Sequence, residues 1–236
     1  MSIEFWAAGS AVSGVDTTLA LVAPTLNVND IIIAQIISQD VDAHLAPDAT
    51  WTAIQAVDNG IILRSSIWWK RAVAADSGAT FTFTSFAGVT GNLGILTVYR
   101  GCKVEGSPIG TSTNSTNIAA DDVTYATLTP LSNNGAVVAC GFYGENATTA
   151  GAITGTAPTM TNVVDVEAVP AGFGLSLFQY WGKLGMGGAT GALTNSTTST
   201  TDAINNGMLF DLLADDRSGG SSGVGSVAYP RVTRTR

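Results

Sequence analysis

Apolar and polar residues alternate along residues 61–101, which predicts three strands joined by two connections. The alternation is clearest in 80–84, where threonine occupies every second position and Phe81 and Phe83 fill the positions between. A period of two residues is typical of an antiparallel strand with one buried face. In 61–70 the same period predicts a core face made of Ile61, Leu63, Ile67 and Trp69. It places on the opposite face Arg64, Ser66 and Lys70.

Short apolar runs separated by Gly, Asn, Asp, Ser or Pro recur along most of the chain. They predict strands at 17–22, 28–38, 50–57, 61–71, 79–84, 92–99, 123–128, 136–143, 163–168, 173–182 and 207–213. The run 31–37 is apolar on both faces, so we expect a central strand that is covered on both sides. Since no convincing helical stripe exceeds two turns, the spacing favours an all-β fold, an antiparallel jelly-roll-like β-sandwich.

Alternation within the strands also predicts the residues of the sheet core, which are Ile33, Ile67, Phe81, Phe83, Ile95, Val138, Phe142, Leu175 and Phe210. Three stretches rich in small and polar residues, 105–122, 144–161 and 185–206, are expected to be long loops. Pro108 should keep the segment after it out of a central strand. No internal repeat stands out in the sequence.

The C-terminal residues differ in composition from the rest of the chain. A stretch rich in Gly and Ser, typical of a flexible linker, leads into an arginine-rich end. We therefore expect a β-sandwich domain over 1–216, followed by a flexible linker and basic C-terminal arm over 217–236. Trp68 is adjacent to another tryptophan on a predicted strand, so one of the two rings must leave the core face unless both faces of the strand are covered. The candidate residues for an interface or assembly surface are Trp68, Tyr229, Arg231, Arg234 and Arg236.

Charged residues make up only 12% of the chain, about half of the ~25% that is usual for soluble domains. A surface of neutral hydroxyls and amides suits a permanent assembly, in which neighbours cover much of the exterior. An extracellular β-protein with a threonine-rich exterior is the alternative. The net charge of −8 argues against nucleic acid as the main partner, because phosphate binding needs clustered Lys and Arg.

His44 is the single histidine, and it lies close in sequence to Asp40, Asp42 and Asp48. These residue types can bind a metal, but their spacing matches no established loop, so a polar connection between strands is the preferred interpretation. A Ser–His–Asp triad would also depend on His44, and the chain contains no G-x-S-x-G elbow. We expect no metal and no cofactor.

Carboxylates and thiols suggest no clearer catalytic site. Asp165 and Glu167 share one face of a predicted strand, and Glu145 follows another strand, but a solvated sheet face explains the pair better than glycoside hydrolysis. Cys140 lies in an apolar run and is expected to be buried, whereas its pairing with Cys102 is left open. We expect no enzymatic activity.

Five short motifs follow one another between residues 19 and 109. They are APTLNVNDIIIAQI, with Asn29-Asp30 in place of Gly-Asp, then APDATWTAI, SIWWKRAVAADSGATFTFT, LGILTVYRGC and GSPIG. In this order they resemble a β-sandwich found in phage-encoded virion proteins, especially tail-associated and head-decorating ones. The resemblance implies a fold and a particle context and brings no catalytic residues with it. Cys102 stands where a small apolar residue is usual.

Residues and resemblance together predict a non-enzymatic structural component of a bacteriophage particle, either capsid-decorating or tail-associated, that acts through protein–protein assembly. The expected partners are other virion proteins and further copies of the chain in a homo-oligomer. The sequence shows no secretory signal and no apolar run long enough for a membrane span, so we expect synthesis in the host cytoplasm, no membrane partner and location in the virion. The alternative is a host-surface carbohydrate- or receptor-binding module, which aromatic side chains clustered in one groove would favour.

Overall fold

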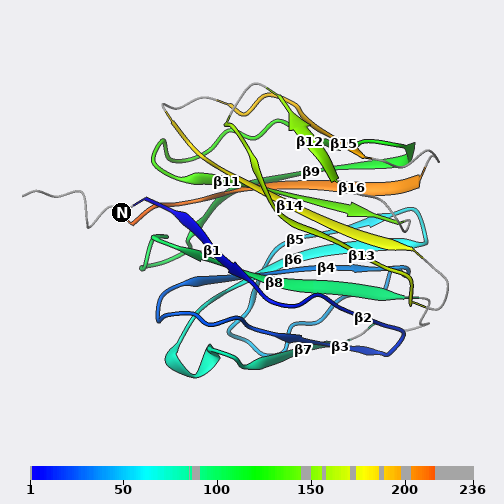
Figure 1. Cartoon of the computed structure of the whole chain (residues 1–236), viewed down its shortest axis with the longest axis horizontal. Helices are drawn as coiled ribbons and strands as arrows, with labels where there is room; N and C mark the ends of the chain where they lie inside the picture. Colours follow the sequence, from blue (N-terminus) through cyan, green and yellow to red (C-terminus); the bar gives the residue numbers. More distant parts are fainter. Residues whose placement is uncertain are drawn as a thin grey trace, which may run out of the picture.

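The computed structural model describes residues 2–84, 86, 91–144, 150–155, 158–170, 174–185, 189–197 and 203–215. The described chain folds into four antiparallel sheets that are stacked as layers (Figure 1). Two large sheets face each other in the middle, and a small sheet covers the outer face of each. The predicted all-β antiparallel sandwich is confirmed, and the jelly-roll connectivity stays a prediction.

The N-terminal half of the chain contributes one large and one small sheet. Its elements are β1 (Glu4–Ala8), β2 (Val12–Gly14), β3 (Thr18–Val22), β4 (Ile31–Ser38), β5 (Thr52–Asn59), β6 (Leu63–Arg71), the 3₁₀ turn η1 (Ala74–Asp76), β7 (Thr80–Thr84) and β8 (Asn92–Arg100). The large sheet has the order β1-β8-β4-β6-β5, with β2 also paired to β8, and β3 pairs with β7 in the outer sheet.

The C-terminal half contributes the other two sheets. Its strands are β9 (Ile109–Ala120), β10 (Val123–Tyr125), β11 (Ala136–Tyr143), β12 (Ala150–Thr154), β13 (Thr161–Ala168), β14 (Leu175–Lys183), β15 (Leu193–Thr197) and β16 (Ala203–Leu212). The large sheet has the order β13-β14-β11-β16-β9, and the outer sheet has the order β10-β15-β12.

The two halves have the same strand order. If β9, β10, β11, β13, β14, β15 and β16 are matched to β1, β3, β4, β5, β6, β7 and β8, both large sheets and both outer pairs coincide. Even β12, which pairs with β15, has a counterpart in the bridge that Leu45 makes to Thr84 on β7. The fold is therefore a structural repeat, which the sequence did not suggest.

The strand registers extend this repeat to single residues. Leu96 lies opposite Ala34, and Leu209 lies opposite Ala139, so the segments Asn92–Gly94 and Asn205–Gly207 occupy equivalent places. Both asparagines donate their side-chain N–H to backbone carbonyls in the turn before the outer strand, at Asp16 in one half and at Ala120 and Asp122 in the other. A Cβ on either Gly94 or Gly207 would collide with the outer strand that covers it.

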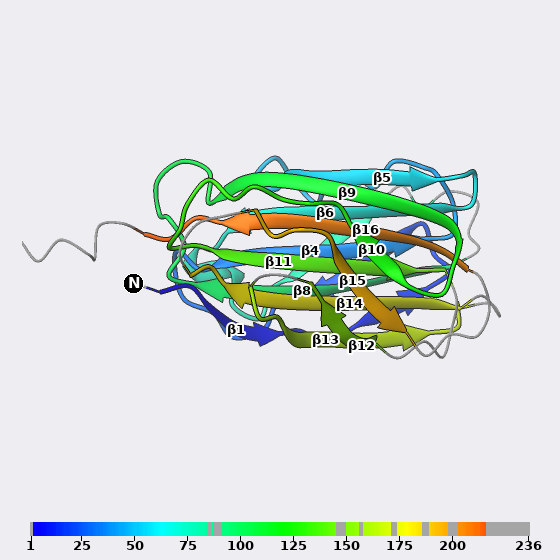
Figure 2. The ribbon, with the colours of Figure 1, turned by 90° about the horizontal axis from the view of Figure 1, so that it is seen from above.

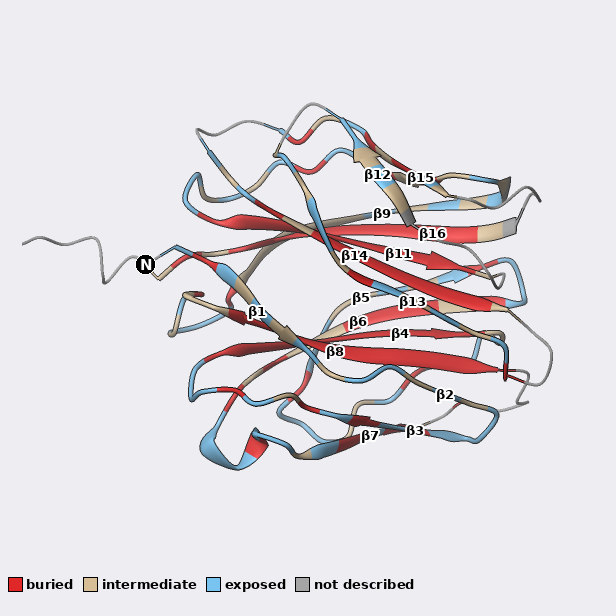
Figure 3. Cartoon of the chain, in the orientation of Figure 1, coloured by how far each residue is buried: buried red, intermediate tan, exposed pale blue. Residues whose placement is uncertain are grey.

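The main core lies between the two large sheets, where side chains of both halves form one hydrophobic cluster (Figure 3). β4 is buried at every position, as expected for a central strand covered on both sides. Gln35 is the polar exception on its inner face, and its Nε2 donates to the carbonyls of Gly141 and Phe178 in the opposite sheet, each at 3.0 Å. All the residues predicted for the core are buried: Ile33, Ile67, Phe81, Phe83, Ile95, Val138, Phe142, Leu175 and Phe210.

The three expected loops contain strands, which corrects the sequence interpretation. β9 lies within 105–122, β12 within 144–161, and β15 with the start of β16 within 185–206. The side chains of β9 explain how so polar a segment stays extended, because Thr111, Thr113 and Ser115 each donate a hydroxyl to a backbone carbonyl of 124–129. β9 begins directly after Pro108 and lies at a sheet edge, as that proline predicts.

The face assignment of 61–70 is correct for Leu63 and Ile67 and wrong for Ile61. β6 begins only at Leu63, after a turn in which Gly60 adopts a φ of 64°, and Ile61 is 85% exposed. The opposite face is not solvated, because the outer sheet covers it. There the Lys70 Nζ lies 3.1 Å from Oδ2 of Asp76, and both side chains are buried.

Candidate interaction surface

His44 forms the centre of a buried chain of hydrogen bonds. Its Nε2 lies 2.7 Å from the Ser38 hydroxyl and its Nδ1 lies 2.7 Å from the Ser66 hydroxyl. Ser38 continues the chain to Oδ1 of Asp40 at 3.1 Å, and Ser66 accepts the indole N–H of Trp68 at 3.1 Å. A single direction of donation satisfies the chain when Ser66 donates to Nδ1 and Nε2–H donates to Ser38.

This arrangement leaves neither ring nitrogen open to a substrate or a metal. Burial lowers the pKa of His44 to about 3, and the nearby Arg64 contributes in the same direction, so the ring is neutral at physiological pH. Asp42 and Asp48 do not hydrogen-bond to the ring in this network. Within the described part of the chain, no group of three or more His, Cys, Asp or Glu side chains could hold a metal ion.

The remaining titratable candidates form no catalytic cluster among the described residues. Asp165 and Glu167 are exposed on β13, and Glu145 lies outside the described residues. Cys102 and Cys140 are free and buried, and burial raises the pKa of each thiol to about 12. A thiol that stays protonated at neutral pH is a poor nucleophile and a poor metal ligand.

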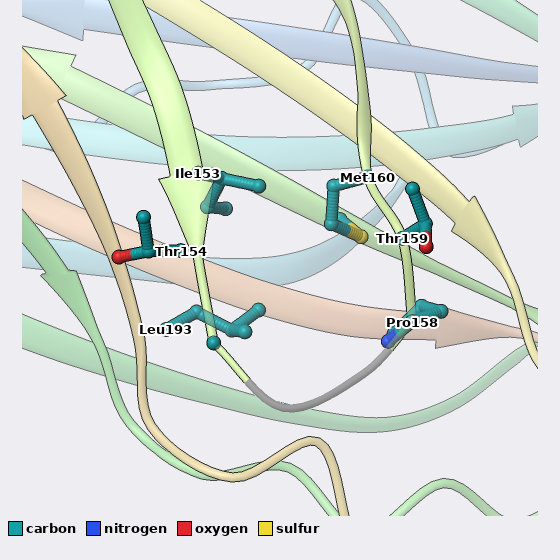
Figure 4. A pocket seen from close by; sticks show the side chains of 7 residues that line it. Ile153, Thr154, Pro158, Thr159, Met160 and Leu193 are labelled. Carbon is teal, nitrogen blue, oxygen red and sulfur yellow. The ribbon is translucent and has the colours of Figure 1, made fainter.

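Two hollows of about 360 Å³ each lie beside β13 and share Thr159. The first lies between the end of β12 and the segment before β13 (Figure 4), and its lining is Ile153, Thr154, Gly155, Pro158, Thr159, Met160 and Leu193. The second is lined by Thr159, Thr161, Trp181, Gly182 and Lys183. Neither lining set contains an acid, a histidine or a cysteine, so the hollows offer apolar and hydroxyl contacts, and the second also offers the ammonium group of Lys183.

The tryptophans are spread over the sandwich. Trp68, a candidate interface residue, is half-buried against the core of the N-terminal outer layer, and its ring centroid lies 6.5 Å from that of Phe83. Trp6 on β1 is 48% exposed and is covered on one side by the guanidinium of Arg100, which is held by Asp30 at 3.0 Å. The role of Trp68 in an interface stays a prediction.

Three isoleucines gather at one end of the sandwich. Ile61 and Ile62 form the turn between β5 and β6, and Ile118 lies near the end of β9, with exposed fractions of 85%, 52% and 73%. The side-chain N–H of Asn59 donates to the Asn117 carbonyl at 2.8 Å, which brings the turn and the strand end together. We call Ile61, Ile62 and Ile118 the isoleucine patch, and the end that carries them the patch end.

The patch end is acidic. Its strand ends and turns carry the carboxylates of Asp16, Asp40, Asp42, Asp58, Asp121 and Asp122. The only cation described at this end is Arg64, which contacts Asp58 at 2.6 Å. All other basic residues of the described chain lie elsewhere, on or beside strand ends at the opposite side of the sandwich. Figure 2 shows β5 running toward the patch end, away from the N-terminus.

The described chain finishes at the opposite end, which we call the arm end. Ala214 bridges to Cys102, and the backbone N–H of Asp215 donates to the Gly101 carbonyl at 3.0 Å. The expected arm 217–236, with Tyr229, Arg231, Arg234 and Arg236, lies outside the described residues. The structure thus fixes where the arm must begin, and its binding role stays a prediction.

No protein-family model, curated protein or solved structure matches this chain. Among the described residues, no helix has the length and apolar character needed to cross a membrane. The assignment of a role therefore depends on the geometry of the chain itself and on the motifs in 19–109.

Sequence reasoning missed the isoleucine patch because it placed Ile61 in the core and treated 105–122 as a loop. The signal was present in Asn59-Gly60, a turn dipeptide just before Ile61. It also missed the repeat, although Leu63 and Trp69 match Leu175 and Trp181 in spacing. These two matches are too few to stand out without the strand registers.

Proposed function

We propose that this chain is a non-enzymatic structural component of a bacteriophage particle, on the capsid or the tail, that acts through protein–protein assembly. The observation that carries the assembly role is the isoleucine patch, because exposed apolar side chains in a cluster mark interaction surfaces. The low content of charge supports the same role. The phage context is supported by the motif order in 19–109, in which Asn29 adopts a φ of 72° where the resembled pattern has glycine.

The direct test is to purify particles of the phage that encodes this chain and to locate the protein in a whole-particle reconstruction. The expected result is the chain in regular copies, with its patch end against another protein. A particle that forms with normal composition and infectivity after deletion of the coding sequence, and that never contains the chain, would overturn the proposal.

A glycan-binding module is the second candidate, favoured by the hollow beside Trp181, where an aromatic ring lies near the hydroxyl residues Thr159 and Thr161. The tryptophans are otherwise dispersed, so the described surface favours assembly. Binding of a host-surface polysaccharide that is lost in Trp181→Ala, but retained in Trp6→Ala, would reverse this order.

A further inference from the structure

We propose that the basic arm 217–236 of one copy docks on the patch end of a second copy, so that copies associate head to tail. This inference rests on the proposed assembly function and names its partner as the chain itself.

The isoleucine patch gives the docking site its apolar part. Ile61 lies in the turn that follows the edge strand β5, and Ile118 lies near the end of the edge strand β9, where no other described strand covers them. The arm carries apolar side chains that suit such a surface, among them Val227, Tyr229 and Val232. An aromatic ring on a short segment is a common anchor at interfaces.

Charge complementarity selects the occupant. The arm contains Arg217, Arg231, Arg234 and Arg236 and no acidic residue. The patch end presents several aspartates around one cation, Arg64, among its described residues. Opposite charges of this density steer encounter and fix orientation, and the effect falls as salt screens it.

The arm begins at the end of the sandwich opposite the isoleucine patch, and this position favours docking on a second copy over docking on the patch of the same copy. The registers of β16 place Leu212 beside Ile109 at the arm end and Ala203 beside Ala120 at the patch end. To reach its own patch, the arm would run back along the whole of β16, roughly 33 Å at 3.3 Å per residue. If a neighbour presents its patch end to the arm end, the arm does not have to span the length of β16. More of its residues can then contact the neighbour.

The interface would be heterologous, since the arm and the patch are different surfaces of one chain. Such contacts build rings when the rotation closes and open filaments when it does not. Each single contact is expected to be weak because the arm loses conformational freedom on docking. Many such contacts in one assembly add up to strong overall binding.

The test uses two variants of the purified full-length chain in sedimentation velocity. The arm variant carries Arg231→Glu, Arg234→Glu and Arg236→Glu, and the patch variant carries Ile61→Asp and Ile118→Asp. Both changes lie on exposed or terminal positions, and circular dichroism checks that each variant keeps the parent's fold. Ala20→Asp, at an exposed apolar position in the middle of β3 and away from both ends of the sandwich, serves as the matched control.

The wild-type chain and the control should self-associate at high concentration, more strongly at low salt, and either variant should weaken this at least tenfold. A mixture of the two variants tests the head-to-tail geometry, because the intact arm of the patch variant can dock on the intact patch of the arm variant. The mixture should form a 1:1 complex and nothing larger. Wild-type chains that stay monomeric up to about 1 mM, or a mixture that forms no complex, would overturn the inference. Particle location tests the proposed function separately, so either can fail alone.

Discussion

At equivalent positions of the two outer sheets, the N-terminal half has Phe83 and the C-terminal half has Asn195. Phe83 lies opposite Leu19, and Asn195 lies opposite Val123. The phenylalanine contacts Trp51, with ring centroids 5.2 Å apart, whereas the asparagine donates to the Tyr180 hydroxyl at 2.7 Å and to the Gly151 carbonyl at 3.0 Å. At this position the same arrangement of strands is thus supported by apolar packing in one half and by hydrogen bonds in the other.

The difference extends across both outer layers. In the N-terminal half, the outer layer is a cluster of leucines and aromatic rings with a buried ion pair at its margin. The C-terminal outer layer also has an apolar cluster, which includes Tyr125, Phe178 and Leu193. Polar contacts are added to it there, because hydroxyls of β9 and the carboxylate of Asp211 bind backbone groups, as when Leu131 N–H donates to Asp211 Oδ2 at 2.9 Å. The comparison teaches that topology constrains where the side chains point and leaves open how each layer is stabilised.

Phe83→Ala should have the largest effect on this comparison. Removal of a fully buried ring leaves a cavity, and we expect the free energy of unfolding to fall by about 3–5 kcal/mol. The equivalent change Asn195→Ala should cost about 1–3 kcal/mol, because it removes the hydrogen bonds to Tyr180 and Gly151. Urea denaturation of both variants checks the order. Equal losses would contradict apolar packing as the main support of the N-terminal layer.

Acid should destabilise the molecule through its N-terminal half, which contains the single histidine. The pKa of His44 is about 3 in the folded chain and 6.5 when unfolded, so the unfolded state binds the proton first as pH falls. The stabilisation is full above pH 6.5 and decreases toward pH 3, by about 2–3 kcal/mol at pH 4.5.

Urea denaturation at pH 7.5 and 4.5 measures this loss, and His44→Gln should reduce it. The histidine ring proton signals in NMR provide a second readout that does not need the variant. They should not shift between pH 7.5 and 5, and a ring that titrates near 6.5 would show that His44 is not buried as described.

Gly207→Ala and Gly94→Ala compare the same position in the two halves. A Cβ at Gly207 would meet the backbone carbonyl of Thr124, whereas one at Gly94 would meet the movable end of the Leu19 side chain at 2.7 Å. We expect Gly207→Ala to cost about 2–3 kcal/mol and Gly94→Ala about 1 kcal/mol, as overpacking does when a neighbour can yield. Melting temperatures suffice to rank them, and the reverse order would contradict the expectation that the Leu19 side chain yields more easily than the Thr124 carbonyl.

Thr113→Val should have the smallest effect of this series. The change removes one hydroxyl that donates to the Ala126 carbonyl at 3.2 Å, and we expect a loss of about 1 kcal/mol. Thr82→Val on β7 is the control, since Thr82 is exposed and should change stability by less than about 0.5 kcal/mol. Indistinguishable melting curves for the two variants would show that the hydroxyl contact of Thr113 does not stabilise β9.

Strands with strong alternation or full burial were predicted from sequence with useful accuracy. The limits of β11 match the prediction, and those of β4, β6, β7 and β8 differ by a few residues at most. β9 and β15 were missed because their threonines and asparagines resemble a loop until the partner carbonyls are known. The isoleucine patch was missed because Ile61 was placed in the core and 105–122 was treated as a loop, and because exposure depends on which strands end side by side.

By itself, the sequence determined which residues alternate, that 31–37 must be covered on both faces, and that the arm differs from the body in charge. Alternation follows from the geometry of a single strand, so it can be read locally. Only the tertiary structure decided that the two halves repeat one strand order, that Gln35 bonds to the opposite sheet, and that β9 is a strand. These features depend on contacts between residues far apart in the chain, where donors and acceptors meet only once the sheets are stacked.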